Sequence, residues 1–276
     1  MSARGRDRVA AVLLAVAPLL AIAVLAGLAA VLVGRGLGEI DPAFLVESPR
    51  DAGRAGGIGP FLVATGLVVG VALAAAAPVG LAAAVYLAEF APRADGRWIG
   101  GALDALAAVP SVLFGLFGLA FFCEALGLGW SVLSGGLTVA LMILPLFVRL
   151  AEEGLRAVPD ELRVAGAALG LPRVTVVGRI LLPEAAPSIG AGLLLATGRV
   201  LAESAALLFT AGAAVRAPDG LLDPGRVLAV HVYLLATEVP GGDARASASA
   251  LVLLGVVVLS GWLARAAPAL VLRRAR

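Results

Sequence analysis

The stretch FLVATGLVVGVALAAAAPVGLAAAVYLA, residues 61–88, runs for 28 residues without a charged side chain. A helix of about 20 apolar residues, rising ~1.5 Å per residue, is long enough to cross the hydrocarbon core of a bilayer. The rest of the chain has the same character: 61% of its 276 residues are hydrophobic, 14% are charged and the mean hydropathy is +1.03. A soluble domain of this length would need far more polar surface. We therefore predict a polytopic membrane protein.

Five other stretches are long and nearly free of charge, and they cover 9–33, 105–122, 131–148, 187–215 and 246–264. The start of the third span is ambiguous, because residues 98–109 include Asp104 and suit a helix at the membrane interface. The first apolar run, of about 25 residues, is longer than the apolar core of a secretory signal, which has about 7–15 residues, so we expect an uncleaved span. The predicted fold class is an all-α membrane protein with six transmembrane helices.

The arginines indicate how the chain is oriented in the membrane. All 21 basic residues are arginine. If the N-terminus is cytoplasmic, fourteen arginines lie on that side and six on the other, and Arg199 lies inside the fifth apolar stretch. Cytoplasmic connections carry an excess of basic residues. We therefore expect both termini to be cytoplasmic.

Missing residue types exclude several kinds of chemistry. A chain without lysine cannot form a phosphate-binding P-loop or a Schiff base. The single cysteine, Cys123, excludes an internal disulfide and a cysteine metal cluster. The single histidine, His231, excludes a zinc site of the H-E-x-x-H kind. We expect no enzymatic activity, cofactor, metal or nucleic-acid partner, and any ATP must be bound by another chain.

The longest cytoplasmic connection is predicted between the fourth and fifth spans and reads AEEGLRAVPDELRVAGAALGLPRVTVVGRILLPEAAP, residues 151–187. Pro159 and Asp160 favour the start of a short helix, whose residues Leu162, Ala165 and Leu169 share one face. Gly170 is a natural stop, and Pro172 can open a second short helix. Such a helix can dock into a groove of a partner, or it can be an ordinary interfacial hairpin.

This connection resembles the EAA loop of bacterial ABC importer permeases, which docks into the cytoplasmic ATPase subunit. The matching frame consists of Ala165, Gly170, Ile180, Leu182 and Pro183. Val164 replaces the family's glutamate, and Gly166 replaces its second alanine. Arg163 or Glu161 is a candidate to supply the missing polar contact. The resemblance thus implies ATPase coupling through Arg163, Ala165, Gly166, Gly170 and Pro183.

Four further segments resemble the permeases of phosphate-specific ABC importers, the PstA and PstC families. They are AVYLAEF (84–90), VPSVLFGLFGL (109–119), AESAALLFTA (202–211) and VHVYLLATE (230–238). The last two are more similar to PstA than to PstC. This resemblance implies an ABC importer transmembrane domain over 61–276, with a coupling loop at about 154–183. Residues 1–60 would form a first span and an external loop.

Arg199 and Glu203 are two charges inside the fifth apolar stretch. Each costs roughly 2.5–3.5 kcal/mol at bilayer depth, so both are expected to face the bundle interior or a wet cavity. Four residues apart on a helix, they share a face and can pair. Arginine offers five fixed donors that match a tetrahedral oxyanion, and glutamate would orient it and weaken anion binding. The alternative is a structural ion pair at a neighbouring subunit.

The PstA pattern also has arginine and glutamate at these two places, which implies a substrate path formed by Arg199, Glu203 and Ser204. In this chain Ala202–Glu203–Ser204 stands where the family reads G-E-T, so the hydroxyl is kept. Ala206 replaces a proline, which predicts a straighter fifth span. Glu89 is expected at the cytoplasmic interface, with a role at a gate as the alternative. Pro110 and Ser111 either break the third span or mark its start.

The resemblance implies a permease subunit of an ATP-driven phosphate importer in the bacterial inner membrane. Its partners would be a PstC-like permease, two PstB-like ATPases, a PstS-like binding protein and membrane lipid. Arginine alone does not select the anion, so a permease for sulfate or molybdate is an alternative. A stand-alone secondary transporter is another, although no inverted repeat is found. An intramembrane protease lacks a serine that matches His231.

Overall fold

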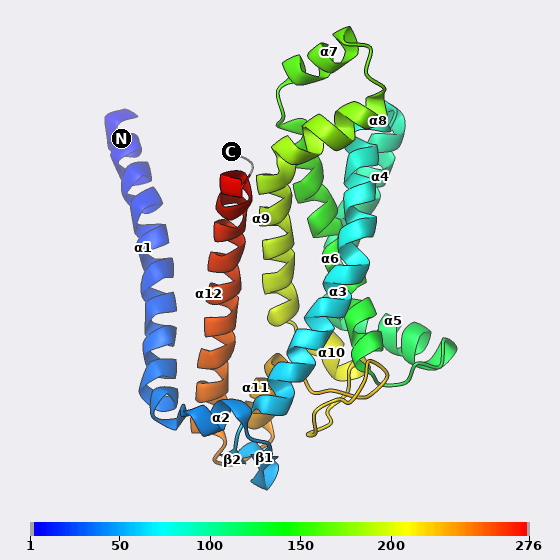
Figure 1. Cartoon of the computed structure of the whole chain (residues 1–276). Helices are drawn as coiled ribbons and strands as arrows, with labels where there is room; N and C mark the ends of the chain where they lie inside the picture. Colours follow the sequence, from blue (N-terminus) through cyan, green and yellow to red (C-terminus); the bar gives the residue numbers. More distant parts are fainter. Residues whose placement is uncertain (1–2, 275–276) are drawn as a thin grey trace.

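The computed structural model describes residues 3–274 as a bundle of long helices (Figure 1). Within that part of the chain, five helical segments are long and apolar enough to cross a membrane, or six if one bent pair is counted as a span. The predicted all-α membrane fold is confirmed. The long helices are α1 (Ala3–Gly36), α3 (Gly59–Val85), α6 (Val132–Arg156), α9 (Leu182–Leu201) and α12 (Asp243–Arg274).

Shorter elements join these helices at the two ends of the bundle. On one side lie α2 (Pro42–Val46) and a two-stranded antiparallel ribbon, β1 (Pro49–Arg50) and β2 (Ala55–Gly56), in which Pro49 pairs with Gly56. The other short helices are α4 (Arg93–Ala107), α5 (Ser111–Gly118), α7 (Asp160–Ala168), α8 (Arg173–Val176), α10 (Ala205–Thr210) and α11 (Leu228–Thr237). Three π-helical segments continue α3, α5 and α8, and they cover Tyr86–Phe90, Leu119–Ala125 and Val177–Leu181.

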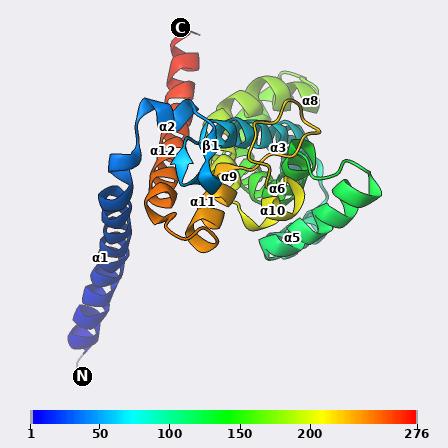
Figure 2. The same cartoon turned by 90° about the horizontal axis from the view of Figure 1, so that it is seen from below.

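Helix α6 forms the centre of the bundle and packs against α3 and α9. Small residues allow the close approach of these helices, as in membrane proteins generally. A Cβ on Gly80 of α3 would lie 2.5 Å from Cδ1 of Phe147, and one on Gly136 of α6 would lie 2.5 Å from Cγ1 of Val71. Viewed along the bundle, α6 is surrounded by α3, α9 and α10, whereas α1 lies apart (Figure 2). Almost all of α1 from Leu14 onward is exposed.

The third predicted span is not a straight helix. Helices α4 and α5, with its π-helical continuation, meet at a bend of 93° at residues 108–110. Pro110 directly precedes α5, so it marks a break and not merely a start. Helix α4 packs along α6, where the Arg149 side chain donates to both carboxylate oxygens of Asp104 at 3.1 and 2.7 Å.

The prediction of a single membrane-spanning helix over residues 187–215 is also wrong. A continuous helical segment runs from Arg173 to Leu201 and stops there. The Oε1 atom of Glu203 accepts a hydrogen bond of 3.1 Å from the amide of Ala206, in the first turn of α10. The expected straightening through loss of a proline at Ala206 is therefore wrong, because the chain turns at residues 202–204 and begins a new helix.

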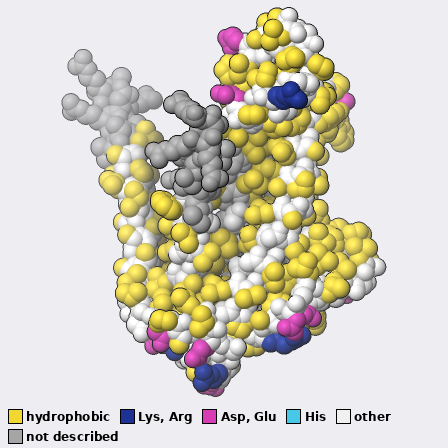
Figure 3. All heavy atoms as spheres, in the orientation of Figure 1, with side chains coloured by type: hydrophobic (Ala, Val, Ile, Leu, Met, Phe, Trp, Pro, Cys, Tyr) yellow, Lys and Arg dark blue, Asp and Glu magenta, His cyan; other side chains and the backbone are white. Residues whose placement is uncertain are grey.

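Charged side chains gather at the two ends of the molecule in the space-filling view, and the surface between is mainly hydrophobic (Figure 3). The N-terminal end of α1 and the C-terminal end of α12 lie at the same end of the bundle as α7 (Figure 1). The ribbon β1–β2 lies at the opposite end. Residues 1–2 and 275–276 lie outside the described part. This arrangement agrees with an even number of membrane crossings.

Candidate functional site

Arg199 lies in the last turn of α9, at the edge of a small hollow between α4, α5 and α6. The hollow has a volume of about 160 Å³ and is lined by Ala107, Val109, Phe114, Met142, Leu146 and Arg199. The Arg199 side chain is exposed. Among the described residues, no hydrogen bond or ion pair engages its guanidinium group. An arginine without a partner beside an apolar hollow can accept an anion.

The predicted pairing of Arg199 with Glu203 is wrong. Glu203 lies beyond the end of α9 and is only 9% exposed. Its carboxylate instead satisfies the amide of Ala206, which would otherwise lack a helical partner. Ser204 lies between the two helices and is half-buried, and its carbonyl accepts from the amide of Leu208 at 2.9 Å. The three predicted path residues therefore lie around one break in the chain.

Helix α7 begins and ends where the sequence predicts. Asp160 follows Pro159, and Gly170 has a φ of +69°, a conformation that favours glycine after a helix end. The predicted second short helix is not separate, because α8 starts after Pro172 and continues into α9, with Pro183 in the first turn of α9. The connection therefore contains one separate short helix, α7, followed by a helical segment that continues without a break into α9.

Beyond its acidic first turn, Asp160 and Glu161, the outer surface of α7 is apolar. Val164 and Leu169 are 67% and 77% exposed, and Ala165 is exposed as well. Gly166 is the one residue of α7 that is fully buried, and it faces Val176 of α8. The departure from the family's alanine at Gly166 thus coincides with a close helix contact.

The Arg163 side chain, one of the two candidates to replace the glutamate of the EAA-like pattern, makes its contacts within the protein. Its guanidinium donates to Glu89 at 2.8 Å, to the carbonyl of Leu155 at 2.8 Å and to that of Val158 at 2.7 Å. Hydrogen bonding to Glu89 raises the pKa of Arg163 above its usual value, against the opposing effect of burial. Asp160, 3.2 Å away, is a further, exposed partner.

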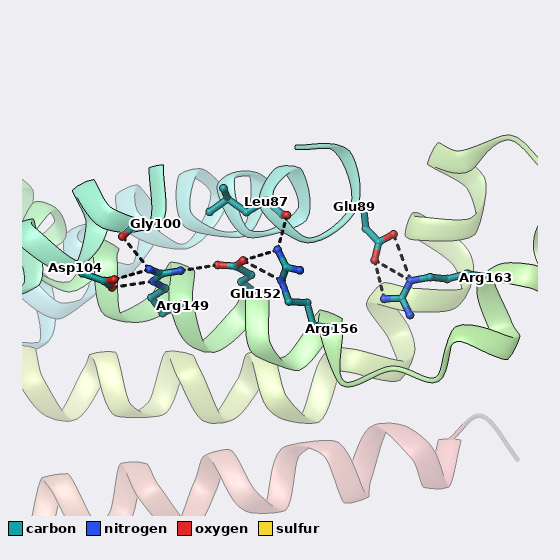
Figure 4. A network of polar contacts seen from close by, with 8 residues as sticks. All are labelled: Leu87, Glu89, Gly100, Asp104, Arg149, Glu152, Arg156 and Arg163. Carbon is teal, nitrogen blue, oxygen red and sulfur yellow. Dashed lines mark hydrogen bonds and ion pairs between the residues drawn. The ribbon is translucent and has the colours of Figure 1, made fainter. Parts of the chain in front are cut away.

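Three more charges continue this network along α6 (Figure 4). Glu152 accepts from Arg149 at 3.3 Å and from Arg156 at 3.0 Å. Arg156 also donates to the carbonyl of Leu87 at 3.0 Å, two residues before Glu89. The ends of α3, α4, α6 and α7 are thus joined by polar contacts. Sequence reasoning missed this network. Arg149, Glu152 and Arg156 have a local spacing of three and four residues, but Glu89 and Arg163 lie 74 residues apart.

His231 is a buried residue of α11. It is 1% exposed in α11 and stacks on Phe61, with ring centroids 4.0 Å apart. Burial, together with the charge of Arg226, lowers the pKa of His231 to about 3. The imidazole is therefore neutral at physiological pH.

Comparison with known families shows what this architecture is. The family described as "Binding-protein-dependent transport system inner membrane component" matches residues 76–271. The chain belongs to this family of ABC importer permeases. Members are membrane-embedded transporter subunits and not enzymes, which favours an importer subunit over a stand-alone secondary transporter.

Two kinds of curated relative support membership of the ABC permease family. The chain is 30% identical over 281 residues to the probable ABC transporter permease protein YqgI of Bacillus subtilis, covering 96% of both chains. It is 41% identical over 158 residues to the phosphate transport system permease protein PstA 1 of Mycobacterium tuberculosis, covering 57% of this chain and 52% of that protein. A PstC permease of Xylella fastidiosa is 32% identical over 214 residues, covering 68% of this chain and 64% of that protein.

Solved structures show the same permease fold. The permease chain of the inward-facing MetNI methionine ABC transporter superposes with a TM-score of 0.60 at 18% identity, covering 78% of this chain and 94% of that chain. A bacterial ABC transporter that imports the acidic polysaccharide alginate superposes with a TM-score of 0.53 at 12% identity, covering 75% of this chain and 79% of that chain. The ABC permease fold is therefore established for this chain independently of what it carries.

Proposed function

We propose that this permease is a PstA-like subunit of an ATP-driven phosphate importer, with its importer domain over 61–276. The similarity to PstA 1 of Mycobacterium tuberculosis supports this assignment over 57% of the chain. The observation that carries it is Arg199, whose exposed guanidinium lies beside an apolar hollow without a partner in the described residues.

A phosphate ion would supply the partner that Arg199 lacks. A charge in a bilayer-spanning segment is costly and usually faces a path or a cavity. The guanidinium fork can donate two parallel hydrogen bonds to a tetrahedral oxyanion. Sulfate and molybdate share this geometry, so they are the competing substrates.

Glu203 and Ser204 would shape the same path from the break between α9 and α10. Because the Glu203 carboxylate is held by the Ala206 amide at 3.1 Å, it stays near Arg199 in the chain without neutralising it by an ion pair. Its charge would repel a bound anion and favour release. The Ser204 hydroxyl would offer a hydrogen-bond donor that carries no charge and so does not repel the anion.

Helix α7 would dock into an ATPase subunit through its exposed surface of Val164, Ala165 and Leu169. Gly166 and Gly170 would contribute by fixing the position of this surface. Pro183 would contribute by starting α9. A PstC-like permease, two PstB-like ATPases and a PstS-like binding protein would complete the importer. In this proposal α7 and both termini face the cytoplasm of a bacterial inner membrane.

Uptake measured in cells that carry the complete transporter tests the proposal. Arg199→Ala should nearly abolish phosphate uptake while the complex still assembles, and Arg199→Lys should fail too, since a point charge cannot replace the fork. Arg35→Ala is the matched control, because Arg35 is likewise an exposed arginine in the last turn of a long apolar helix, α1, outside the proposed path and the coupling loop. If sulfate or molybdate competes for uptake more strongly than phosphate does, that anion and not phosphate is the substrate.

A further inference from the structure

Helix α7 is attached to the bundle by little apolar packing, although the proposed function gives it a mechanical task. Gly166 is its one buried residue, Leu162 and Arg163 are half-buried, and the other six are exposed. Among the described residues, apolar packing is limited to Leu162, which contacts the hydrophobic core, and to the contact of Gly166 with Val176. Polar contacts add to this small apolar attachment.

The Arg163 side chain makes these polar contacts. Its five N–H donors meet two oxygens of the bundle's own backbone, at Leu155 and Val158, as well as the carboxylates of Glu89 and Asp160. The Glu89 side chain is 5% exposed, so this part of the contact excludes water. The carbonyls belong to the C-terminal end of α6 and the turn after it, where a cation is favoured by the helix dipole.

Glu89 belongs to the π-helical turn Tyr86–Phe90, which ends α3. The same turn is held from α6, because Arg156 donates to the carbonyl of Leu87 at 3.0 Å. Figure 4 shows Glu89 facing Arg163 on one side and Leu87 facing Arg156 on the other. Single π-helical turns are common at functional positions in helices. A displacement of α7 would pull on this turn through one buried charge pair.

We propose that Glu89 and Arg163 are positioning residues that transmit movement of α7 to the end of α3. The inference rests on the proposed docking of α7 to an ATPase. In this arrangement Arg163 does not touch the ATPase, because the docking surface is the exposed part of α7 and the Arg163 side chain contacts the bundle. Loss of the pair should leave the ATPase bound and uncouple its hydrolysis from transport.

The test uses the complete transporter in proteoliposomes with Glu89→Gln, Arg163→Gln and the double variant. The matched control is Asp160→Asn, which removes the 92% exposed partner of the same arginine and should change little. We expect all three pair variants to retain the ATPase but to transport several-fold less phosphate per ATP hydrolysed. The double variant should be no worse than Arg163→Gln alone, because removal of Arg163 already removes the pair.

Hydrogen exchange of residues 160–169 gives a second readout that needs no ATPase. Glu89→Gln should speed exchange there by about tenfold, the effect of losing a hydrogen bond to a charged group, and Asp160→Asn should not. Unchanged transport per ATP together with unchanged exchange would overturn the inference. If exchange rises but no variant of the α7 surface alters ATPase binding, the pair still positions α7 and the proposed docking is what fails.

Discussion

The Cα atom of Gly166 in α7 lies so close to Val176 in α8 that an added Cβ would come within 2.7 Å of Cγ2 of the valine. The valine is stiff at χ1, so it cannot easily turn away. The sequence motif would favour alanine at Gly166, but the contact in this chain requires glycine.

Gly166→Ala should therefore destabilise α7 by about 1–3 kcal/mol, the usual cost of overpacking. Val176→Ala removes the opposing methyl groups, so the double variant should recover most of the loss. The measurement is hydrogen exchange of residues 160–169 in the two single variants and the double. Additive effects of the two changes would show that the contact does not determine the position of α7.

We expect that the space around Gly170 can hold a larger side chain, but that its backbone conformation disfavours most other residues. No heavy atom lies within 4 Å of a Cβ built there, whereas its φ of +69° disfavours other residues. Gly170→Val should weaken co-purification of the ATPase by altering the end of α7, and Gly170→Asn should do so less, because asparagine tolerates this region. Equal association of both variants would count against a role for the helix end.

The local signals around α7 could be predicted because proline, acidic residues and glycine act within one turn of the chain. The breaks at residues 108–110 and 202–204 were harder. The second carries neither glycine nor proline, and its apolar run continues on both sides. The helix ends there because the Glu203 side chain bonds to the next helix, an interaction that periodicity does not reveal. The Arg163–Glu89 pair was hidden for a different reason, since 74 residues separate its members.

The pH dependence of stability should include a contribution from His231. Its pKa is about 3 in the folded protein, below the ordinary value of 6.5, so the unfolded chain binds a proton first. Stability is thus fully present above about pH 6.5 and falls as the pH drops towards 3, by up to about 1.4 kcal/mol per pH unit. The melting temperature of the solubilised complex at pH 7 and pH 5 measures this. His231→Leu should reduce the difference, and an unchanged difference would assign it to carboxylates.

The orientation of the chain can be tested with single cysteines. Val174 in α8, at the same end of the bundle as α7, and Leu222 near the opposite end are 72% and 63% exposed. After replacement of the buried Cys123 by alanine, a membrane-impermeant maleimide should label Leu222→Cys in intact cells and Val174→Cys only in inside-out vesicles. The reverse pattern would place α7 and both termini outside.

The break between α9 and α10 separates two roles of Glu203, its charge and its hydrogen bond to Ala206. Glu203→Gln keeps an oxygen that can accept from the Ala206 amide, so the complex should assemble normally while phosphate uptake changes. Glu203→Leu removes the acceptor as well, and loss of such a helix-start contact costs about 0.5–2 kcal/mol. Assembly is followed by co-purification, and uptake is followed with labelled phosphate.

Combining Glu203→Leu with Arg199→Leu distinguishes a substrate path from a structural pair at a neighbouring subunit. Arg199 and Glu203 do not pair within this chain, but charges that serve only to hold a neighbouring subunit often tolerate joint replacement by apolar residues. A path residue does not, because the lost guanidinium is the donor for the anion. We therefore expect the double variant to assemble at least as well as Glu203→Leu and still to import almost no phosphate. Normal uptake by the double variant would remove Arg199 from the substrate path.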